Sequence, residues 1–183
     1  MANINDFKAK LAGGGARANQ FKVTMPFPGY AQVGGEIEEL AFLCRATSIP
    51  SMEVGTIPVP FRGRAVKIAG DRTIPSWSVT AYNDTNFKLR NAFERWQDAI
   101  NGAATNVSGR GVNASSFDSY TANMEIEQLS RTGAVIKRYV IVGAWPTVVD
   151  TIDVSYDSTD TIEEFAVTFA YQWWEANTTS VST

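Results

Sequence analysis

The chain has 183 residues and a formal net charge of −3, and 44% of its residues are hydrophobic and 11% aromatic. This length suits one domain with extensions, and the apolar fraction is ample for a packed core. The absence of histidine removes the usual general base and zinc ligand, and the single cysteine excludes a disulfide framework.

The charge is unevenly distributed along the sequence. Residues 1–138 contain 16 basic and 12 acidic side chains, whereas residues 139–183 contain 7 acidic side chains and no basic one. Such a split indicates a surface that meets an oppositely charged surface. We expect no membrane segment, because no apolar run approaches roughly 18 residues, and no secretory signal, because the N-terminus lacks an apolar stretch.

The first 20 residues are polar and rich in alanine and glycine, which predicts a flexible N-terminal arm over residues 1–20. We place a β-sandwich domain over residues 21–175 and a C-terminal tail over residues 176–183. At the start of the domain, "QFKVTM" alternates apolar and polar side chains and predicts the first strand.

The apolar run "LAFLCRATSI" at residues 40–49 predicts a buried strand in which Cys44 is a small buried hydrophobe. Three prolines and three glycines interrupt the short β-branched runs of residues 50–72. Because proline donates no hydrogen bond to a sheet, this segment is not a central strand. We expect a long, stiffened β-hairpin or loop, and connections of this length are usually functional.

The sequence "SWSVTAY" at residues 76–82 predicts a strand with Trp77, Val79 and Ala81 on one face. Asn83 and Asp84 follow it and offer the side chains that cap a helix N-terminus.

One amphipathic helix is predicted over residues 86–100. Its apolar side chains form a continuous core stripe: Leu89, Phe93, Trp96 and Ile100. Arg90 and Glu94 are spaced to pair on the solvent side, which contributes only about 0.3–0.5 kcal/mol. The apolar stripe, rather than the ion pair, therefore holds the helix in place.

The stretch "NMEIEQLSRTGAVIKRYVIV" predicts a hairpin that turns at Thr132–Gly133. In this register the predicted partners are Ile126 with Tyr139, Met124 with Ile141, Glu127 with Arg138, and Leu129 with Ile136. "TIDVSYD" and "EEFAVTFAYQWWE" predict two more strands. In the second of them the predicted shared face consists of Phe165, Val167, Phe169, Tyr171 and Trp173.

The sequence contains no Gly-x-Ser-x-Gly elbow, P-loop or dinucleotide fingerprint. "SGRGVN" is rich in glycine but follows no predicted strand. The carboxylates of residues 150–164 are irregularly spaced, which favours a solvated acidic edge or a partner surface over a glycosidase pair or a calcium loop. The pair Trp173–Trp174 suits a sugar platform less well than a core or interface, because one side chain must point inward. We therefore expect no enzyme, no cofactor and no metal.

Several motifs in order give the chain a specific resemblance over roughly residues 16–175. They are "AGDR", "WSVT", "NDTNFKLRNAFERW", "GAVIK", "GAWP" and "DSTDTIEEFAVTFAY". Together they resemble the tail tube proteins of contractile-tailed bacteriophages. The resemblance implies a mostly β fold, a β-sandwich or barrel with one flanking α-helix and a long extended hairpin loop.

The resemblance also implies an assembly. Six copies would close into a ring, and rings would stack into a hollow virion tail tube, assembled in the host bacterial cytoplasm and surrounded by a contractile sheath. The implied partners are further copies of the chain, the tail sheath protein, the tape measure protein and the baseplate and terminator proteins. Genomic DNA would pass through the lumen without specific binding.

Three other functions stay open at this point. A tube subunit of a phage-derived injection machine that carries protein cargo shares the fold, and genomic neighbours separate it from a phage subunit. A carbohydrate-binding β-sandwich would show itself by glycan binding as a monomer. An enzyme ranks last.

Two sets of surface residues are candidates for the assembly. The long hairpin carries bases and the region after residue 149 carries acids, which predicts head-to-tail docking between copies, with contact inside one subunit as the alternative. The docking candidates are Arg62, Arg64, Lys67, Arg72, Asp150, Asp153, Asp157, Asp160, Glu163 and Glu164. Glu125 and Glu127 alternate with core residues, and we expect them to line a polar lumen that does not hold phosphates, with an ordinary solvated strand face as the alternative.

Overall fold

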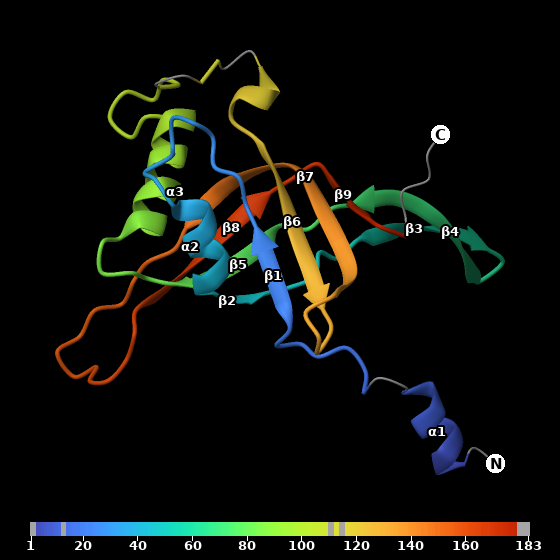
Figure 1. Cartoon of the computed structure of the whole chain (residues 1–183). Coiled ribbons are helices and arrows are strands. Elements are labelled where there is room, and N and C mark those ends of the chain that lie inside the picture. The colour runs from blue at the N-terminus through green and yellow to red at the C-terminus, as the bar shows by residue number, and fades with distance from the viewer. Residues whose placement is uncertain (1–2, 12–13, 110–111, 114–115, 179–183) are drawn as a thin grey trace.

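The computed structural model describes residues 3–11, 14–109, 112–113 and 116–178 (Figure 1). Parts of the predicted arm, of "SGRGVN" and of the C-terminal tail lie outside these ranges. The described residues form a mostly β fold, as expected, with helices packed at one end of the sheets.

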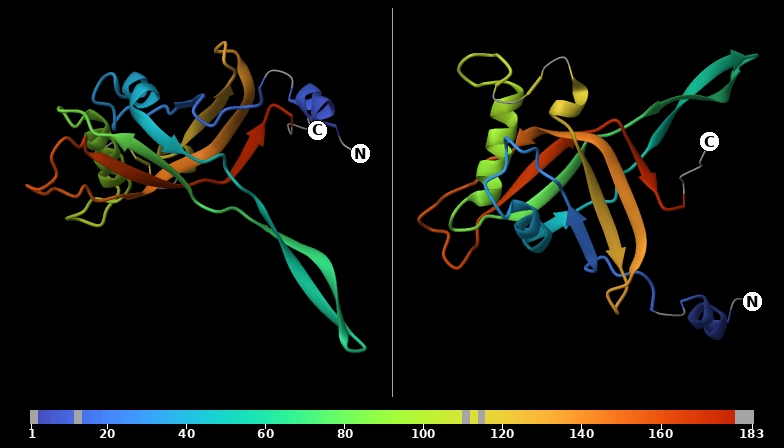
Figure 2. Two further views of the ribbon diagram at one scale, coloured as in Figure 1. Left: turned by 90° about the horizontal axis from the view of Figure 1, so that it is seen from below. Right: turned by 45° about the horizontal axis from the view of Figure 1, so that its top comes forward.

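Seven strands form one sheet that folds back on itself. In spatial order they are β1 (Phe21–Thr24), β6 (Ala122–Leu129), β7 (Val135–Val149), β8 (Glu164–Ala170), β5 (Trp77–Tyr82) and β2 (Cys44–Thr47), and β9 (Trp173–Ala176) also pairs with β7. The first part of β7 pairs with β6 and β9, and its last part pairs with β8. This one long strand therefore belongs to both layers of the fold (Figure 2).

The bend of β7 lies at Gly143, whose φ of 64° is the left-handed conformation that glycine adopts without strain. Its amide donates a 3.0 Å hydrogen bond to the side-chain oxygen of Asn123 on β6. A Cβ atom at this position would lie 2.9 Å from Cε1 of Phe117. Glycine is thus required both by the backbone and by the space at the corner.

The core lies between the two layers. Trp77, Val79 and Ala81 of β5 are buried, as their alternation predicts, and they pair with Phe169, Val167 and Phe165 of β8. Val23, Met124, Ile126 and Ile141 bury their side chains from the opposite layer. Every second residue of these strands therefore faces one common apolar interior.

Helix α3 (Lys88–Ile100) closes one end of the core. Of its predicted stripe, Leu89, Phe93 and Trp96 are completely buried, and Ile100 is half-buried against the same cluster. The Phe93 ring centroid lies 5.9 Å from that of Phe169 and 5.0 Å from that of Phe27. The helix thus joins the sheet to the segment after β1.

Helix α3 begins at Lys88, two residues later than predicted, and its N-cap residue is Phe87, which forms no side-chain cap, rather than Asn83 or Asp84. The carboxylate of Asp84 accepts hydrogen bonds from the backbone amides of Asn86 and Lys88, at 3.1 and 2.9 Å. The bond to Lys88 satisfies one of the first amides of the helix, which have no partner within the helix itself.

Arg90 has a larger role than a solvent-exposed ion pair. It pairs with Glu94 at 2.7 Å, but its own side chain is only 19% exposed. Its guanidinium lies 5.5 Å from the ring centroid of Phe165 and donates to the backbone carbonyl of Asp150. Arg90 therefore attaches α3 to β8 and to the start of the acidic region.

Two helices occur where the sequence analysis expected other structure. Helix α2 (Glu36–Leu43) takes up residues 40–43 of the strand predicted over residues 40–49, and β2 follows it. Cys44, predicted to be buried, is only half-buried at the start of β2. Glu36 stabilises its start, because the carboxylate accepts from the amides of Val33 and Gly34 at 3.2 and 2.6 Å. The apolar run was misread because short apolar runs fit a strand and a buried helix equally well.

Helix α1 (Ile4–Lys10) lies in the segment predicted to be a flexible arm. Asn3 and Asp6 form a reciprocal capping box at its start. None of its residues is buried, and it stands apart from the sheets (Figures 1 and 2).

Three smaller expectations were wrong. Residues 151–157 form a loop rather than a strand. Leu129 pairs with Val135 instead of Ile136, because an irregularity follows Gln128, although the other three predicted pairs of this hairpin are confirmed. Trp173 is exposed and does not share the buried face of β8, because the chain leaves that layer after Ala170 and resumes as β9.

Candidate assembly surfaces

The long hairpin consists of β3 (Glu53–Phe61) and β4 (Arg64–Thr73), which confirms the predicted hairpin. The two strands form a separate sheet that projects from the core (Figure 2). Arg62 and Gly63 both have positive φ, 45° and 83°, which is the backbone of a tight two-residue hairpin turn. The hairpin is held by its own ladder and contributes nothing to the core.

One face of this hairpin is apolar and exposed. Ile57 pairs with Ile68 and Val59 pairs with Val66, so the four side chains share a face. All four are exposed, as is Phe61 near the turn. A contiguous exposed apolar surface of this kind marks an interaction site.

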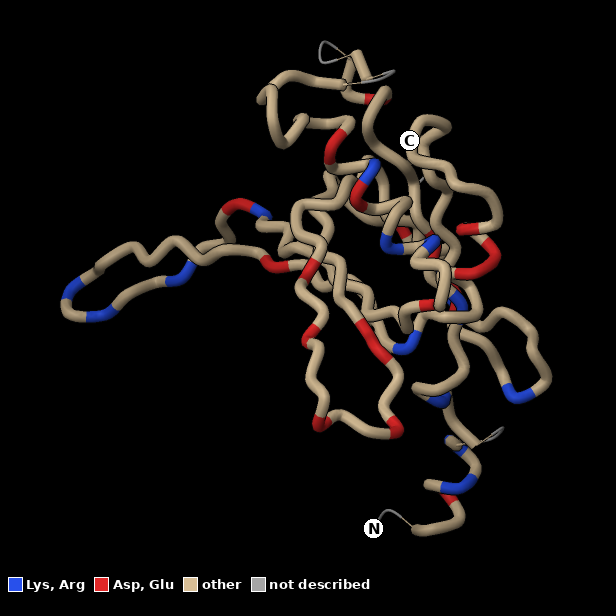
Figure 3. Tube along the Cα trace, turned by 90° about the vertical axis from the view of Figure 1, so that its left-hand side faces the viewer, with Lys and Arg blue, Asp and Glu red and all other residues tan. Residues whose placement is uncertain are grey.

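The basic docking candidates cluster on the hairpin. Arg62, Arg64, Lys67 and Arg72 are exposed, and none forms an ion pair within the described ranges. Figure 3 shows basic residues along the projecting hairpin and acidic residues on a separate loop of the body. The bases are thus available to another molecule.

The acidic candidates lie on the loop between β7 and β8 and at the start of β8. Figure 2 places this loop at the end of the molecule opposite the hairpin, so the structure does not bring the two charged sets together. Asp153, Asp157 and Asp160 are exposed, together with the apolar side chains of Val154 and Tyr156. This loop combines negative charge with uncovered apolar surface.

Contacts inside the subunit occupy part of the acidic set. Glu164 forms an ion pair with Arg45 of β2, and this hydrogen bond raises the pKa of the Arg45 guanidinium. Glu163 accepts a 2.9 Å hydrogen bond from the side-chain amide of Asn83. Asp150 offers its backbone carbonyl to Arg90. Inside the subunit the acidic region thus pairs with Arg45, a base that lies outside the hairpin.

The lumen candidates Glu125 and Glu127 share the face of β6 that points away from the core. Arg138 on β7 pairs with the carboxylates of both residues, with 3.7 Å between its Nε and Oε1 of Glu127. The hydrogen bond that Arg138 donates to the Glu125 carboxylate raises the pKa of the Arg138 guanidinium. This sheet face is therefore polar and carries charges of both signs.

Three strands leave one edge unpaired within the part of the chain that the structure describes. β1 and β2 are the edge strands at the two ends of the sheet, and β9 pairs only with β7, so its other edge is also unpaired. Unpaired edges present free amide and carbonyl groups, which bind another strand unless something covers them.

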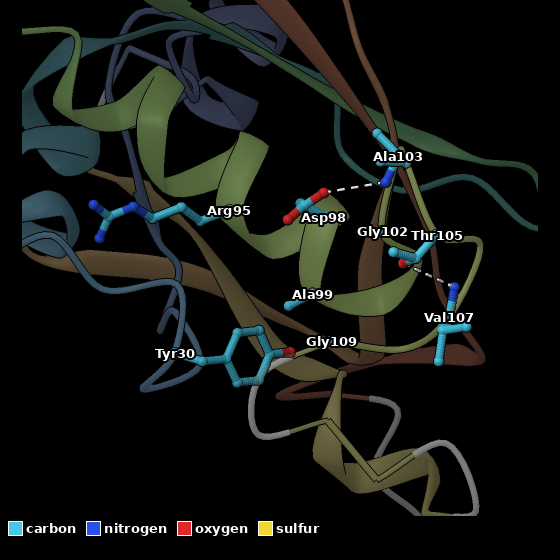
Figure 4. Close-up of a pocket in the computed structure, with 10 residues that line it drawn as sticks. Tyr30, Arg95, Asp98, Ala99, Gly102, Ala103, Thr105, Val107 and Gly109 are labelled. Carbon is cyan, nitrogen blue, oxygen red and sulfur yellow. Dashed lines mark hydrogen bonds between the residues drawn. The ribbon is translucent and has the colours of Figure 1, made fainter.

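A pocket of about 490 Å³ lies at the C-terminal end of α3 (Figure 4). Asp98 accepts a 3.2 Å hydrogen bond from the amide of Ala103, and the side chain of Arg95 points away from Asp98. Burial raises the pKa of the Tyr30 hydroxyl to about 12, and the hydroxyl has no hydrogen-bond partner within the described chain. The pocket thus shows polar groups that organise a loop and no paired nucleophile and base.

Among the described residues, no three acidic or cysteine side chains are grouped as a metal site. No helix in these ranges has the length and apolar character to cross a membrane.

Comparisons with known proteins match nearly the whole chain. The family described as "Phage tail tube protein" matches residues 16–177. The tail tube protein gp19 of Enterobacteria phage T4 is 34% identical over 169 residues, which cover 92% of this chain and 96% of gp19.

Solved structures share the fold. A chain of the baseplate of the anti-feeding prophage, determined with 6-fold symmetry, has a TM-score of 0.63 at 14% identity, covering 88% of this chain and 95% of that one. A chain of the sheath–tube complex of PVC, an extracellular contractile injection system, has a TM-score of 0.57 at 14% identity, covering 92% and 95%.

Proposed function

The chain belongs to the phage tail tube protein family, and on that premise we propose that its copies close into rings of six that stack into a hollow tail tube. The tube is a conduit for the genome during ejection, and a contractile sheath surrounds it. The observation that carries the proposal is a closed core from which strand edges and a hairpin extend without partners in the described chain, together with a loop whose Asp153, Asp157 and Asp160 are exposed. Tube growth from such stacked contacts requires no catalysis, and we infer a structural role.

The free edges supply the ring contacts. An edge strand of one copy pairs with an edge strand of the next, so that unpaired amides and carbonyls are satisfied and the sheets continue around the ring. The same pairing would lead to aggregation in a monomeric protein. In a ring it closes on itself and leaves no exposed edge.

The hairpin docks on the acidic loop of a neighbouring copy. The two surfaces lie at opposite ends of one subunit and carry opposite charges, which favours head-to-tail contact and opposes like-to-like contact. The exposed apolar side chains of both surfaces, such as Ile57 and Tyr156, supply the area to bury. Each solvent-exposed ion pair contributes only about 0–1 kcal/mol, so charge sets register and rate more than stability.

The partners in this proposal are the sheath, which appears with a tube in the PVC complex, and the baseplate, terminator and tape measure proteins of a tail. Assembly takes place in the bacterial cytoplasm. Glu125 and Glu127 line the lumen together with Arg138, and this balanced polar surface lets a duplex slide because few phosphates are neutralised.

Electron microscopy of the purified chain tests the assembly. Long hollow tubes or stacked rings are the expected result, and a monomer at every concentration, with no tubes even beside baseplate components, would overturn it. The double variant Arg62→Glu with Arg64→Glu should block tube growth but leave the fold intact by circular dichroism. Mixing it with Asp157→Lys and Asp160→Lys should restore co-assembly. Normal tubes from the hairpin variant alone at physiological salt would refute docking through charge.

The inner tube of an injection machine that carries protein cargo is the second candidate, because such machines supply structures with this fold. The phage relative is closer in sequence, at 34% identity against 14% for the injection systems. Capsid and terminase genes beside this gene would decide for the phage.

A further inference from the structure

Helix α1 carries an apolar stripe that nothing in the described chain covers. Ile4, Phe7 and Leu11 are spaced i, i+3 and i+7 and therefore line one side of the helix and its C-terminal cap. Ile4 and Phe7 are 67% and 65% exposed. Lys8 and Lys10 flank the stripe, and with Asp6 they leave α1 with one net positive charge.

A groove on the body has the complementary chemistry. It has a volume of about 550 Å³ and lies between α2 and the segment that leads into α3. Phe42, which lines it, is 87% exposed although it belongs to a helix that packs on the core. Glu38, Glu39 and Asp84 also line the groove, against the single base Lys88. The groove therefore offers an apolar centre with a net negative rim.

One atom of this groove lacks a hydrogen-bond donor. Oε1 of Glu39 accepts from Nζ of Lys88 at 2.6 Å, whereas its other oxygen, Oε2, is buried without any partner. A buried carboxylate oxygen without a donor is costly, and it gains one if the Glu39 side chain turns this oxygen toward a base that enters the groove. This is an observation independent of the exposed phenylalanine.

We propose that α1 of one copy docks in the α2 groove of a neighbouring copy. Phe7 and Leu11 pack on Phe42, and Lys8 or Lys10 pairs with the acidic rim that Glu38, Glu39 and Asp84 form. This inference rests on the proposed function, because it gives the tube an arm that clasps adjacent subunits. Nine residues, 12–20, join the arm to β1 and span at most about 30 Å, enough to reach an adjoining subunit.

A disulfide between two differently substituted chains tests the docking directly. Cys44 is first replaced by alanine, so that no native thiol competes. One chain then carries Ile4→Cys, and a second chain, lengthened by a tag, carries Glu38→Cys. A disulfide in the mixture forms only between copies, and it keeps Phe7, Leu11 and Phe42 in place. A second chain with Val135→Cys, exposed on the β6–β7 hairpin, is the matched control.

The expected result is a mixed dimer on non-reducing gels with Glu38→Cys and none with Val135→Cys. Adding Lys8→Glu and Lys10→Glu to the first chain should remove it, and raising the salt concentration should weaken it. Assembled tubes without the mixed dimer, or equal cross-linking with the control, would overturn the proposal. If the wild-type chain forms no rings or tubes, the proposed function fails on its own. The same cross-link, scored on the unassembled chains, then supports the docking if present and refutes it if absent.

Discussion

Trp96 is the residue on which the closure of the core by α3 depends most. Its side chain is completely buried, and its ring centroid lies 5.7 Å from that of Phe27. The indole Nε1 donates a 2.8 Å hydrogen bond to the backbone carbonyl of Tyr120, in the segment before β6. One side chain thus joins α3 to the segment after β1 and to the segment before β6, and Trp96→Ala removes all of these contacts together.

We expect Trp96→Ala to lower the free energy of unfolding by about 3–5 kcal/mol, because the ring leaves a cavity that the core fills only partly. The Tyr120 carbonyl also loses its donor, which places the cost in the upper part of that range. Trp96→Phe keeps most of the ring but not the donor, and about 1–3 kcal/mol is expected. A domain is stable by only about 5–15 kcal/mol, so the alanine variant should unfold at a clearly lower temperature.

Urea denaturation followed by circular dichroism measures these losses in dilute, unassembled protein. Trp173→Ala is the matched control, because it makes the same substitution at a side chain that is 48% exposed on β9. It should cost under about 1 kcal/mol. If Trp96→Ala destabilised the subunit no more than Trp173→Ala but abolished assembly, α3 would be an interface element and the reasoning would be refuted.

Three further predictions concern single sites. Arg90→Ala should lower the free energy of unfolding in urea by about 1–2 kcal/mol, because it removes the contacts with Phe165 and the Asp150 carbonyl. Glu94→Ala should lower it by less than about 0.5 kcal/mol, and equal effects of the two variants would mean that only the ion pair matters. Burial raises the pKa of Cys44 from 9.0 to about 11, so the native chain contains less thiolate at pH 8. A disulfide reagent should therefore react roughly 100-fold more slowly with the native chain than with the urea-unfolded chain, and similar rates would contradict the burial. Gly143→Ala should destabilise the subunit by about 1–3 kcal/mol, because the position has a positive φ and the new Cβ would clash with Phe117. Gly133→Ala should destabilise it less, because its φ is also positive but its Cβ would meet nothing within 4 Å; thermal melts compare the two variants.

The sequence predicts the register of β6 and β7 well because both faces of that hairpin have matching chemistry. Ile126 faces Tyr139 on one side and Glu127 faces Arg138 on the other. A slip of one residue would exchange the core face and the solvent face of the whole strand. The sequence does not indicate the change of register at Leu129, because the residues beyond it are half-buried or exposed and suit either pairing.

Helix α2 was missed for a different reason. The four residues "LAFL" fit a strand as well as a helix, and the deciding signals precede them: Gly35 at the N-cap and three acidic residues in the first turn. The capping box of α1 was equally readable at Asn3 and Asp6, but a short helix without a buried face gives no periodic core signal. Pairing between distant segments, such as Arg90 with the Asp150 carbonyl, cannot be read from local sequence at all.

The placement of the assembly candidates separates folding from assembly. Of the hairpin, the acidic loop and α1, none supplies a residue to the buried core cluster. The energy that stabilises one subunit and the energy that joins copies therefore come mostly from different residues. The acidic loop is the exception, because Ile152 packs against the core cluster and Glu164 pairs with Arg45. Substitutions on these surfaces should change the rate and register of tube growth and leave the unfolding of the subunit nearly unchanged. The opposite holds for α3, where a lost contact with Phe27 or Phe169 loosens the core itself. Only the strand edges belong to both sets, since they are part of the core sheet and also the proposed joint between copies.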